Sequence, residues 1–135
     1  MEVQINYPAV VTAVIVTQIL GSLWYSPLLF GKAWVAAVGV SEEKLKEGGV
    51  ARAYVGAIAG SAVMAYVLAH FVDYTLSITV AEGLQCGFWL WLGFIATTAA
   101  VNSLFEKRPL RLYLINQGYH LACLLAMGAI LAVWQ

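Results

Sequence analysis

The sequence predicts an all-α integral membrane protein, a bundle of four membrane-spanning helices that forms a single domain over residues 1–135. Hydrophobic residues make up 62% of the chain, and charged residues make up only 10%. A soluble domain has about 45–50% apolar and about 25% charged residues, so this chain has too few charged groups to cover a water-exposed surface. The mean hydropathy is +0.83 and the formal net charge is zero. This composition excludes a disordered chain, a disulfide scaffold and a nucleic-acid-binding protein with a basic face.

Four long segments have no charged side chain in their central part, and each approaches the about 20 apolar residues that a helix needs to cross a bilayer. Backbone amides cannot remain unpaired in lipid, and these segments show no strict alternation of apolar and polar residues, so helices are expected. The predicted spans are residues 8–27, 51–73, 79–103 and 111–134.

The basic residues lie in two of the three connecting segments. They are Lys32, Lys44, Lys46 and Arg52 between the charge-free stretches of the first and second spans, and Lys107, Arg108 and Arg111 between those of the third and fourth. The positive-inside rule assigns both basic loops to the cytoplasm and both termini to the outside. We therefore expect a multi-pass protein of a bacterial-type inner membrane, with the lipid bilayer as its first partner.

The first loop is long enough to have structure of its own. Ser41 is a suitable N-cap for a short amphipathic helix that runs to Glu47, with Gly48 as the next residue. Leu45 and the preceding stretch AWVAAVGV would then lie on the inner membrane surface. A solvated connector is an equally good interpretation.

Small residues recur at four-residue spacing in every predicted span, a pattern that favours close packing of helices in lipid. The third span has Gly83 and Gly87, and the fourth has Gly118, Ala122 and Ala126. The second span has two adjacent small faces, one of which contains a GxxxG motif. This second face predicts a homo-oligomer.

The string WYSPLLFGKAW, at residues 24–34, follows the first span. Its aromatic, basic and proline residues are candidate interfacial anchors, namely Trp24, Tyr25, Pro27, Phe30, Lys32 and Trp34. Pro27 ends or kinks the first helix, and Lys32 is within reach of lipid phosphates or of the carbonyl groups at the helix end. We prefer this anchoring interpretation to a binding site.

Together with GFWLWLGF at residues 87–94, NSLFEKRP at 102–109 and LINQGYHL at 114–121, this string resembles a family of small bacterial and fungal membrane proteins that is catalogued as a domain of unknown function. The similarity covers nearly the whole chain and keeps the order of the motifs. The resemblance implies four membrane helices. It brings no established activity, cofactor or catalytic residue.

Polar side chains within the spans are the candidate functional residues, because such groups are costly in hydrocarbon. They are Gln18, Gln85, Asn102, Asn116, Gln117 and His120. His120 is a candidate proton-relay group or ligand contact, because imidazole titrates near neutral pH. Our preferred interpretation is a neutral histidine that forms a hydrogen bond with Gln18, Asn102 or a backbone carbonyl.

At the outer end, His70, Asp73 and Glu82 are weak candidates for a divalent-cation site. A hydrated polar rim is the commoner outcome for residues at this level. The two cysteines, Cys86 and Cys123, fall in apolar runs and predict neither a disulfide nor a zinc site. No catalytic residue and no cofactor are predicted.

Three functions compete on these grounds. The preferred one is an oligomeric transporter or channel for a small solute or ion, with the six polar residues along its route. The first alternative is a structural or accessory membrane protein, in which the same groups join helix to helix. The second is a membrane-embedded enzyme that uses the outer His/Asp/Glu cluster, although we expect no enzyme.

Overall fold

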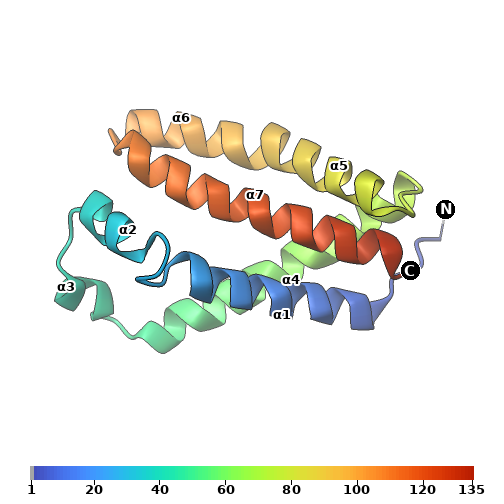
Figure 1. Cartoon of the computed structure of the whole chain (residues 1–135), viewed down its shortest axis with the longest axis horizontal. Coiled ribbons are helices and arrows are strands. Elements are labelled where there is room, and N and C mark those ends of the chain that lie inside the picture. The colour runs from blue at the N-terminus through green and yellow to red at the C-terminus, as the bar shows by residue number, and fades with distance from the viewer. Residues whose placement is uncertain (1) are drawn as a thin grey trace.

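The computed structural model describes residues 2–135, and within this range it contains helices and no strand (Figure 1). The elements in chain order are α1 (Tyr7–Trp24), α2 (Gly31–Val38), α3 (Glu42–Lys46), α4 (Val50–Tyr74), α5 (Val80–Leu90), the π-helical segment η1 (Trp91–Ala96), α6 (Thr97–Phe105) and α7 (Leu110–Val133). Successive elements α5, η1 and α6 form one continuous helix. The predicted all-α class is confirmed.

Four helices within residues 2–135 are long and apolar enough to cross a membrane. They are Tyr7–Trp24, Val50–Tyr74, Val80–Phe105 and Leu110–Val133. Their lengths of 18 to 26 residues correspond to about 27 to about 39 Å at the rise of an α-helix. Capping residues set the start of two of these helices. Asn6 caps α1, and Thr79 and Glu82 form a capping box at the start of α5.

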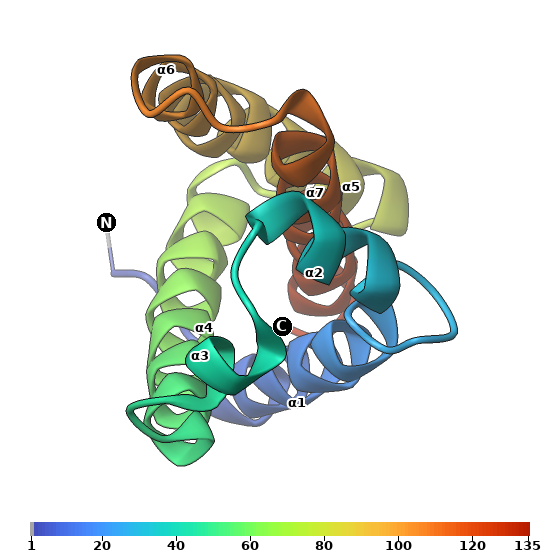
Figure 2. The ribbon, with the colours of Figure 1, turned by 90° about the vertical axis from the view of Figure 1, so that its left-hand side faces the viewer.

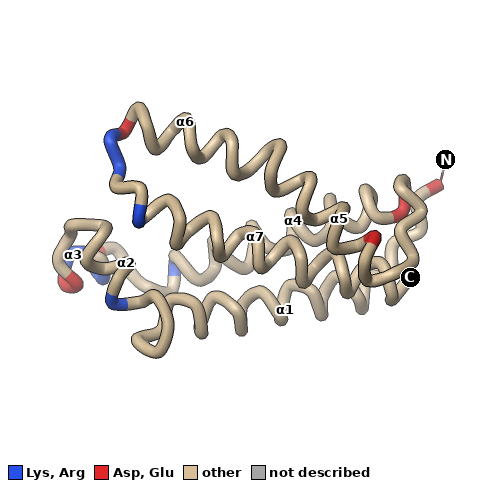
Figure 3. Tube along the Cα trace, turned by 45° about the horizontal axis from the view of Figure 1, so that its top comes forward, with Lys and Arg blue, Asp and Glu red and all other residues tan. Residues whose placement is uncertain are grey.

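Helix α7 is the central element, because it contacts α1, α4 and α5 (Figures 1 and 2). Both chain ends lie at one end of the molecule, which we call the terminal end. All seven Lys and Arg residues gather toward the other end, which we call the basic end (Figure 3). The long helices therefore connect two ends of different charge.

Helices α5 and α7 meet through their backbones. A Cβ atom on Gly83 would collide with the carbonyl group of Gly128, and one on Gly87 would collide with the carbonyl oxygen of Leu124. Such contact gives dispersion attraction and Cα–H···O contacts without a bulky side chain in between. The expected role of Gly83 and Gly87 is confirmed.

On α7 the partner in this contact is Gly128, which lies outside the predicted stripe of Gly118, Ala122 and Ala126. Gly118 instead leaves room for the Trp24 ring, whose nearest atom would lie 2.9 Å from an added Cβ. Four-residue spacing alone did not distinguish the side of α7 that faces α5 from the side that faces α1.

The apolar core lies toward the terminal end. Its buried residues come from α1, α4 and α7, and they are Ala9, Val10, Ala13, Ala65, Leu68, Ala69, Val72, Leu124, Met127, Leu131 and Ala132. Small residues on α1 and α4 let these helices approach α7 closely. The terminal half of the molecule is therefore tightly packed.

The basic half is more open. Residues 50–60 of α4 are exposed throughout, and a Cβ atom added to Gly56 or Gly60 would meet nothing within 4 Å. Figure 1 shows α4 diverging from α6 in this direction. The chain therefore presents a closed terminal half and a splayed basic half.

The first loop contains two short helices, whereas the sequence predicted one. The Ser41 hydroxyl caps α3 by accepting from the Lys44 amide at 3.3 Å, so the predicted cap is confirmed. Helix α3 ends at Lys46, one residue before the predicted end. The stretch expected to lie on the membrane surface forms α2, which contacts α7.

We predict that Gly128→Val lowers the free energy of unfolding by about 1–3 kcal/mol or more, because overpacking at this backbone contact forces α5 and α7 apart. The matched control is Gly93→Val, which makes the same change at a helix position where an added Cβ atom would meet nothing within 4 Å. Denaturant titration in detergent micelles, followed by helical circular dichroism, measures the difference. Equal losses in the two variants would contradict the packing described here.

Candidate functional site

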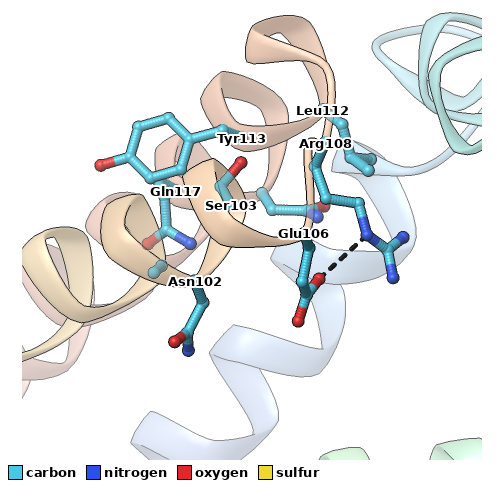
Figure 4. Close-up of a pocket in the computed structure, with 9 residues that line it drawn as sticks. Asn102, Ser103, Glu106, Arg108, Leu112, Tyr113 and Gln117 are labelled. Atoms are coloured by element: carbon cyan, nitrogen blue, oxygen red, sulfur yellow. Dashed lines mark hydrogen bonds and ion pairs between the residues drawn. The ribbon is translucent and has the colours of Figure 1, made fainter.

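The candidate site is a polar pocket of about 340 Å³ between α6 and α7 at the basic end (Figure 4). Its lining residues are Ala99, Asn102, Ser103, Glu106, Arg108, Leu112, Tyr113, Asn116 and Gln117. On each helix these positions recur at three- and four-residue intervals, which places them on one face. The pocket is thus formed by two opposed helix faces.

The turn between the two helices holds the pocket's outer edge. The backbone amide of Arg108 donates to the Ser103 carbonyl at 2.9 Å, and Lys107 takes a left-handed conformation with φ of 53°. The Glu106 carboxylate accepts from Arg108 Nε at 3.0 Å. Both of these side chains are about half exposed, so their pairing adds little stability. Within the pocket lining, the charges of Glu106 and Arg108 offset each other.

Gln117 is the most unusual residue of the pocket. It is only 8% exposed, and its Oε1 atom has no hydrogen-bond partner among residues 2–135. A buried polar atom without a partner costs about 1–3 kcal/mol. Its backbone is held, because Trp91 Nε1 donates to the Gln117 carbonyl at 3.1 Å. The protein therefore fixes the backbone of Gln117 and leaves its side-chain oxygen buried and without a partner among the described residues.

The neighbouring amide, Asn116, is fully oriented by two aromatic residues. Its Oδ1 atom accepts from the Tyr25 hydroxyl at 2.9 Å and from Trp34 Nε1 at 3.1 Å. An indole nitrogen can only donate, so the atom that it meets must be the carbonyl oxygen of the amide. The Nδ2 group is then the part of Asn116 that remains available to the pocket.

A second cavity of about 190 Å³ lies between α4 and α7. Its lining residues include Ser61, His120 and Cys123. His120 lies one helical turn beyond Asn116, on the same face of α7. Gln18 reaches the wall of this cavity, since its Nε2 donates to Ser61 Oγ at 3.0 Å.

The predicted hydrogen bond of His120 is wrong. Within residues 2–135 no hydrogen bond joins His120 to Gln18, Asn102 or a backbone carbonyl, and Gln18 bonds Ser61. Tyr119 is the aromatic neighbour of the imidazole, with the ring centroids 5.4 Å apart. His120 is therefore held by packing.

The six predicted polar residues separate into three groups. Asn102, Asn116 and Gln117 line the main pocket, while His120 and the partner of Gln18 line the second cavity. Gln85 is exposed on α5 and lines neither cavity. Gln85 lies outside the main pocket because α6 and α7 form that pocket, whereas Gln85 is on α5.

The motif at residues 24–34 contacts α7 through its aromatic residues. Trp24 Nε1 donates to the Ile115 carbonyl at 3.0 Å, in addition to the two bonds that Tyr25 and Trp34 make to Asn116. Phe30 packs on Trp24 with ring centroids 4.7 Å apart. The three polar aromatic side chains thus bond helix α7, a role that the anchoring interpretation did not include.

The remaining motif residues lie at the surface. Pro27 is exposed in the turn after α1, and Lys32 lies beside Glu42 and Lys46 in a shallow pocket between α2 and α3. Helix α1 ends at Trp24, before the proline.

Sequence reasoning missed several pocket residues, namely Ser61, Ser103, Glu106, Arg108 and Tyr113. The four-residue spacing of Asn102 and Glu106 was the available signal, although Glu106 lies three residues beyond the predicted end of the third span. Their opposition to α7 depends on tertiary structure and leaves no trace in local periodicity.

The outer His/Asp/Glu cluster does not form. Within the described residues, no group of three or more His, Cys, Asp or Glu side chains is arranged to hold a metal ion. The Glu82 carboxylate accepts from the backbone amides of Ile78 and Thr79, both at 2.9 Å, and thereby caps α5. His70 Nδ1 lies 2.9 Å from the Tyr66 carbonyl oxygen. Local backbone contacts occupy these side chains.

We predict opposite effects for two neighbouring substitutions in the pocket. Asn116→Leu lowers the free energy of unfolding by about 1–3 kcal/mol, because the Tyr25 and Trp34 donors lose their acceptor. Gln117→Leu leaves stability unchanged or raises it, because it removes an oxygen that has no partner. Denaturant titration in micelles compares the two variants, and equal destabilisation would be inconsistent with this assignment.

Comparison with known proteins gives one match. Residues 8–132 match the model of a family described as "Protein of unknown function (DUF1761)". No curated protein and no solved structure matches the chain. Because the family model covers nearly all of the sequence, this chain belongs to the DUF1761 family of proteins of unknown function.

Proposed function

We propose that this chain is an oligomeric membrane transporter or channel for a small solute, and that the pocket between α6 and α7 is its solute site. The observation that carries the proposal is Gln117, a buried polar residue in the lining of a polar pocket whose Oε1 atom has no hydrogen-bond partner among residues 2–135. Polar groups that only join helices would be bonded to each other, as Gln18 and Ser61 are. Within residues 2–135 the side-chain oxygen of Gln117 makes no such bond, and only its backbone carbonyl joins α7 to a neighbouring helix, by accepting from Trp91 Nε1.

The packing of the molecule supports a path that enters from the basic end. The terminal half is closed by the apolar core, while the pocket and the exposed part of α4 lie in the basic half. His120 continues the polar face of α7 inward from Asn116 and Gln117. A closed half and an open half are the expected features of a transporter in one of its two states.

The distribution of charge supports an orientation. In a bilayer we propose that the four long helices form a bundle, with the basic end in the cytoplasm and both termini outside. The seven Lys and Arg residues at the basic end favour this arrangement, because positively charged segments are retained on the cytoplasmic side. The membrane would be the inner membrane of a bacterial-type cell.

Self-association is part of the proposal. The small residues of α4 at positions 53–60 are exposed, and Gly56 and Gly60 have no neighbour within 4 Å of an added Cβ. Lipid tails fill such a face less well than a second helix does. A narrow single chain with its solute pocket at one end also offers little room for a complete path.

A structural or accessory role is the second candidate. The bonds from Tyr25 and Trp34 to Asn116, and from Gln18 to Ser61, favour it because they join helices. Transport through the pocket requires the Gln117 side chain, whereas a structural role does not.

Flux through proteoliposomes tests the proposal. We expect the purified chain to raise the permeability of vesicles to at least one of acetamide, glycerol and K⁺ above that of protein-free vesicles. Gln117→Leu should then lower this flux about tenfold, which corresponds to a loss of about 1.4 kcal/mol of interaction free energy with the solute. Gln85→Leu is the matched control, because it makes the same change at an exposed position outside the pocket. Vesicles that pass none of the three probes would favour the structural role.

The orientation predicts how cysteine variants are labelled. In a chain without Cys86 and Cys123, a membrane-impermeant maleimide should label Ile78→Cys on intact cells, because residue 78 lies in the exposed turn at the terminal end. Glu47→Cys, in the exposed loop at the basic end, should react only after permeabilisation. The reverse pattern would mean that the topology is inverted.

A further inference from the structure

The second cavity, of about 190 Å³ between α4 and α7, gathers most of the sulfur-containing residues of the chain. Two of the chain's three methionines line it, together with one of its two cysteines and one of its two histidines. These residues are Met64 on α4 and His120, Cys123 and Met127 on α7. The other lining residues are Ala57, Gly60, Ser61 and Tyr119. Half of the lining therefore consists of residues with thioether, thiol or imidazole groups.

The spacing of the three α7 residues places them on one side of that helix. His120, Cys123 and Met127 follow one another at intervals of three and four positions, which align side chains along a helix face. Helix α4 contacts α7 and contributes Met64 to the same cavity. Groups that can donate electron pairs to a metal thus come to one small space from two helices.

The imidazole of His120 is available to a ligand. Neither of its ring nitrogens has a hydrogen-bond partner within residues 2–135, yet Gln117 Oε1 is the one fully buried side-chain nitrogen or oxygen without a partner in that range. Both ring nitrogens of His120 therefore retain accessible surface. Met64 is also partly exposed, whereas Cys123 and Met127 are 2% and 1% exposed and line the inner wall of the cavity. An ion can thus enter past His120 and Met64.

The chemistry of these groups favours a soft, singly charged metal ion. Thiolate and thioether ligands select Cu⁺, and imidazole also suits copper. Within the described chain, no Asp, Glu, Lys or Arg lines the cavity. When Cu⁺ replaces the thiol proton of Cys123, the ion and the thiolate together carry no net charge. A divalent ion would leave a positive charge in apolar surroundings, which is costly.

We infer that Met64, His120, Cys123 and Met127 form a binding site for a soft monovalent metal ion such as Cu⁺. Cys123 binds as the thiolate and releases its proton to the solvent, while the imidazole and the two thioethers bind as neutral ligands. This inference goes beyond the proposed transport function. Binding is measured on the purified chain, so its outcome is independent of whether any solute crosses a membrane.

Competition with bicinchoninate, a Cu⁺ chelator whose complex is coloured, tests the inference in micelles that contain ascorbate as the reductant. The chain should withdraw an equimolar amount of Cu⁺ from the chelator, which is measured as loss of colour. Cys123→Ser should abolish this withdrawal. Cys86→Ser is the matched control and should retain it, because it makes the same change at a cysteine outside the cavity.

Two further variants separate the four-residue site from a single reactive thiol. Met64→Leu and Met127→Leu nearly conserve side-chain volume, so both variants should remain folded, which helical circular dichroism checks. Each should weaken the affinity for Cu⁺ about tenfold, which corresponds to about 1.4 kcal/mol of binding free energy. An affinity that survives both methionine changes would overturn the inference. Equal Cu⁺ withdrawal by Cys123→Ser and Cys86→Ser, no withdrawal by the unaltered chain, or tighter binding of Zn²⁺ than of Cu⁺ would also overturn it.

Discussion

The contact between the backbones of α5 and α7 is the constraint on which the rest of the structure depends. Gly83 and Gly87 have no side chain, so their helix approaches Gly128 and Leu124 directly. In lipid there is no hydrophobic force between helices, and association relies on such close packing and on hydrogen bonds. With α5 fixed on α7 and the apolar core closed around the terminal half, the helices can diverge at the other end without loss of the fold. The polar pocket lies in that divergent half.

Hydrogen bonds replace close packing at the basic end. Trp24, Tyr25 and Trp34 all donate to α7, and two of them share the Asn116 carbonyl oxygen. These bonds join α7 to the end of α1 and to α2. They also orient an amide that would otherwise be free to rotate. The same contacts therefore stabilise the helix arrangement and define the chemistry of the pocket wall.

Much of the fold follows from the sequence, because long charge-free runs in lipid allow only helices. The cap at Ser41 and the role of Gly83 were also predictable, since both depend on local spacing. The site was only partly predictable. The free-energy cost of a polar side chain in hydrocarbon identified Asn102, Asn116 and Gln117 as candidates. Whether each amide bonds a neighbour or faces a cavity depends on residues distant in the chain. Tyr25 bonds Asn116 across 91 positions, and no periodicity encodes that pairing.

The π-helical segment η1 explains how one long helix presents two different faces to α7. In an uninterrupted α-helix, at about 100° per residue, the face of Ala99, Asn102 and Glu106 would be turned roughly 90–100° from Gly87. A π-helical turn accommodates an extra residue and offsets about that much rotation, so both the glycine face and the polar face meet α7. The winding of residues Trp91–Ala96 therefore sets which face of α6 meets α7. Regular α-helical winding of the same residues would turn the amide-bearing face of α6 away from α7, whereas loss of one residue would restore regular winding and keep that face on α7.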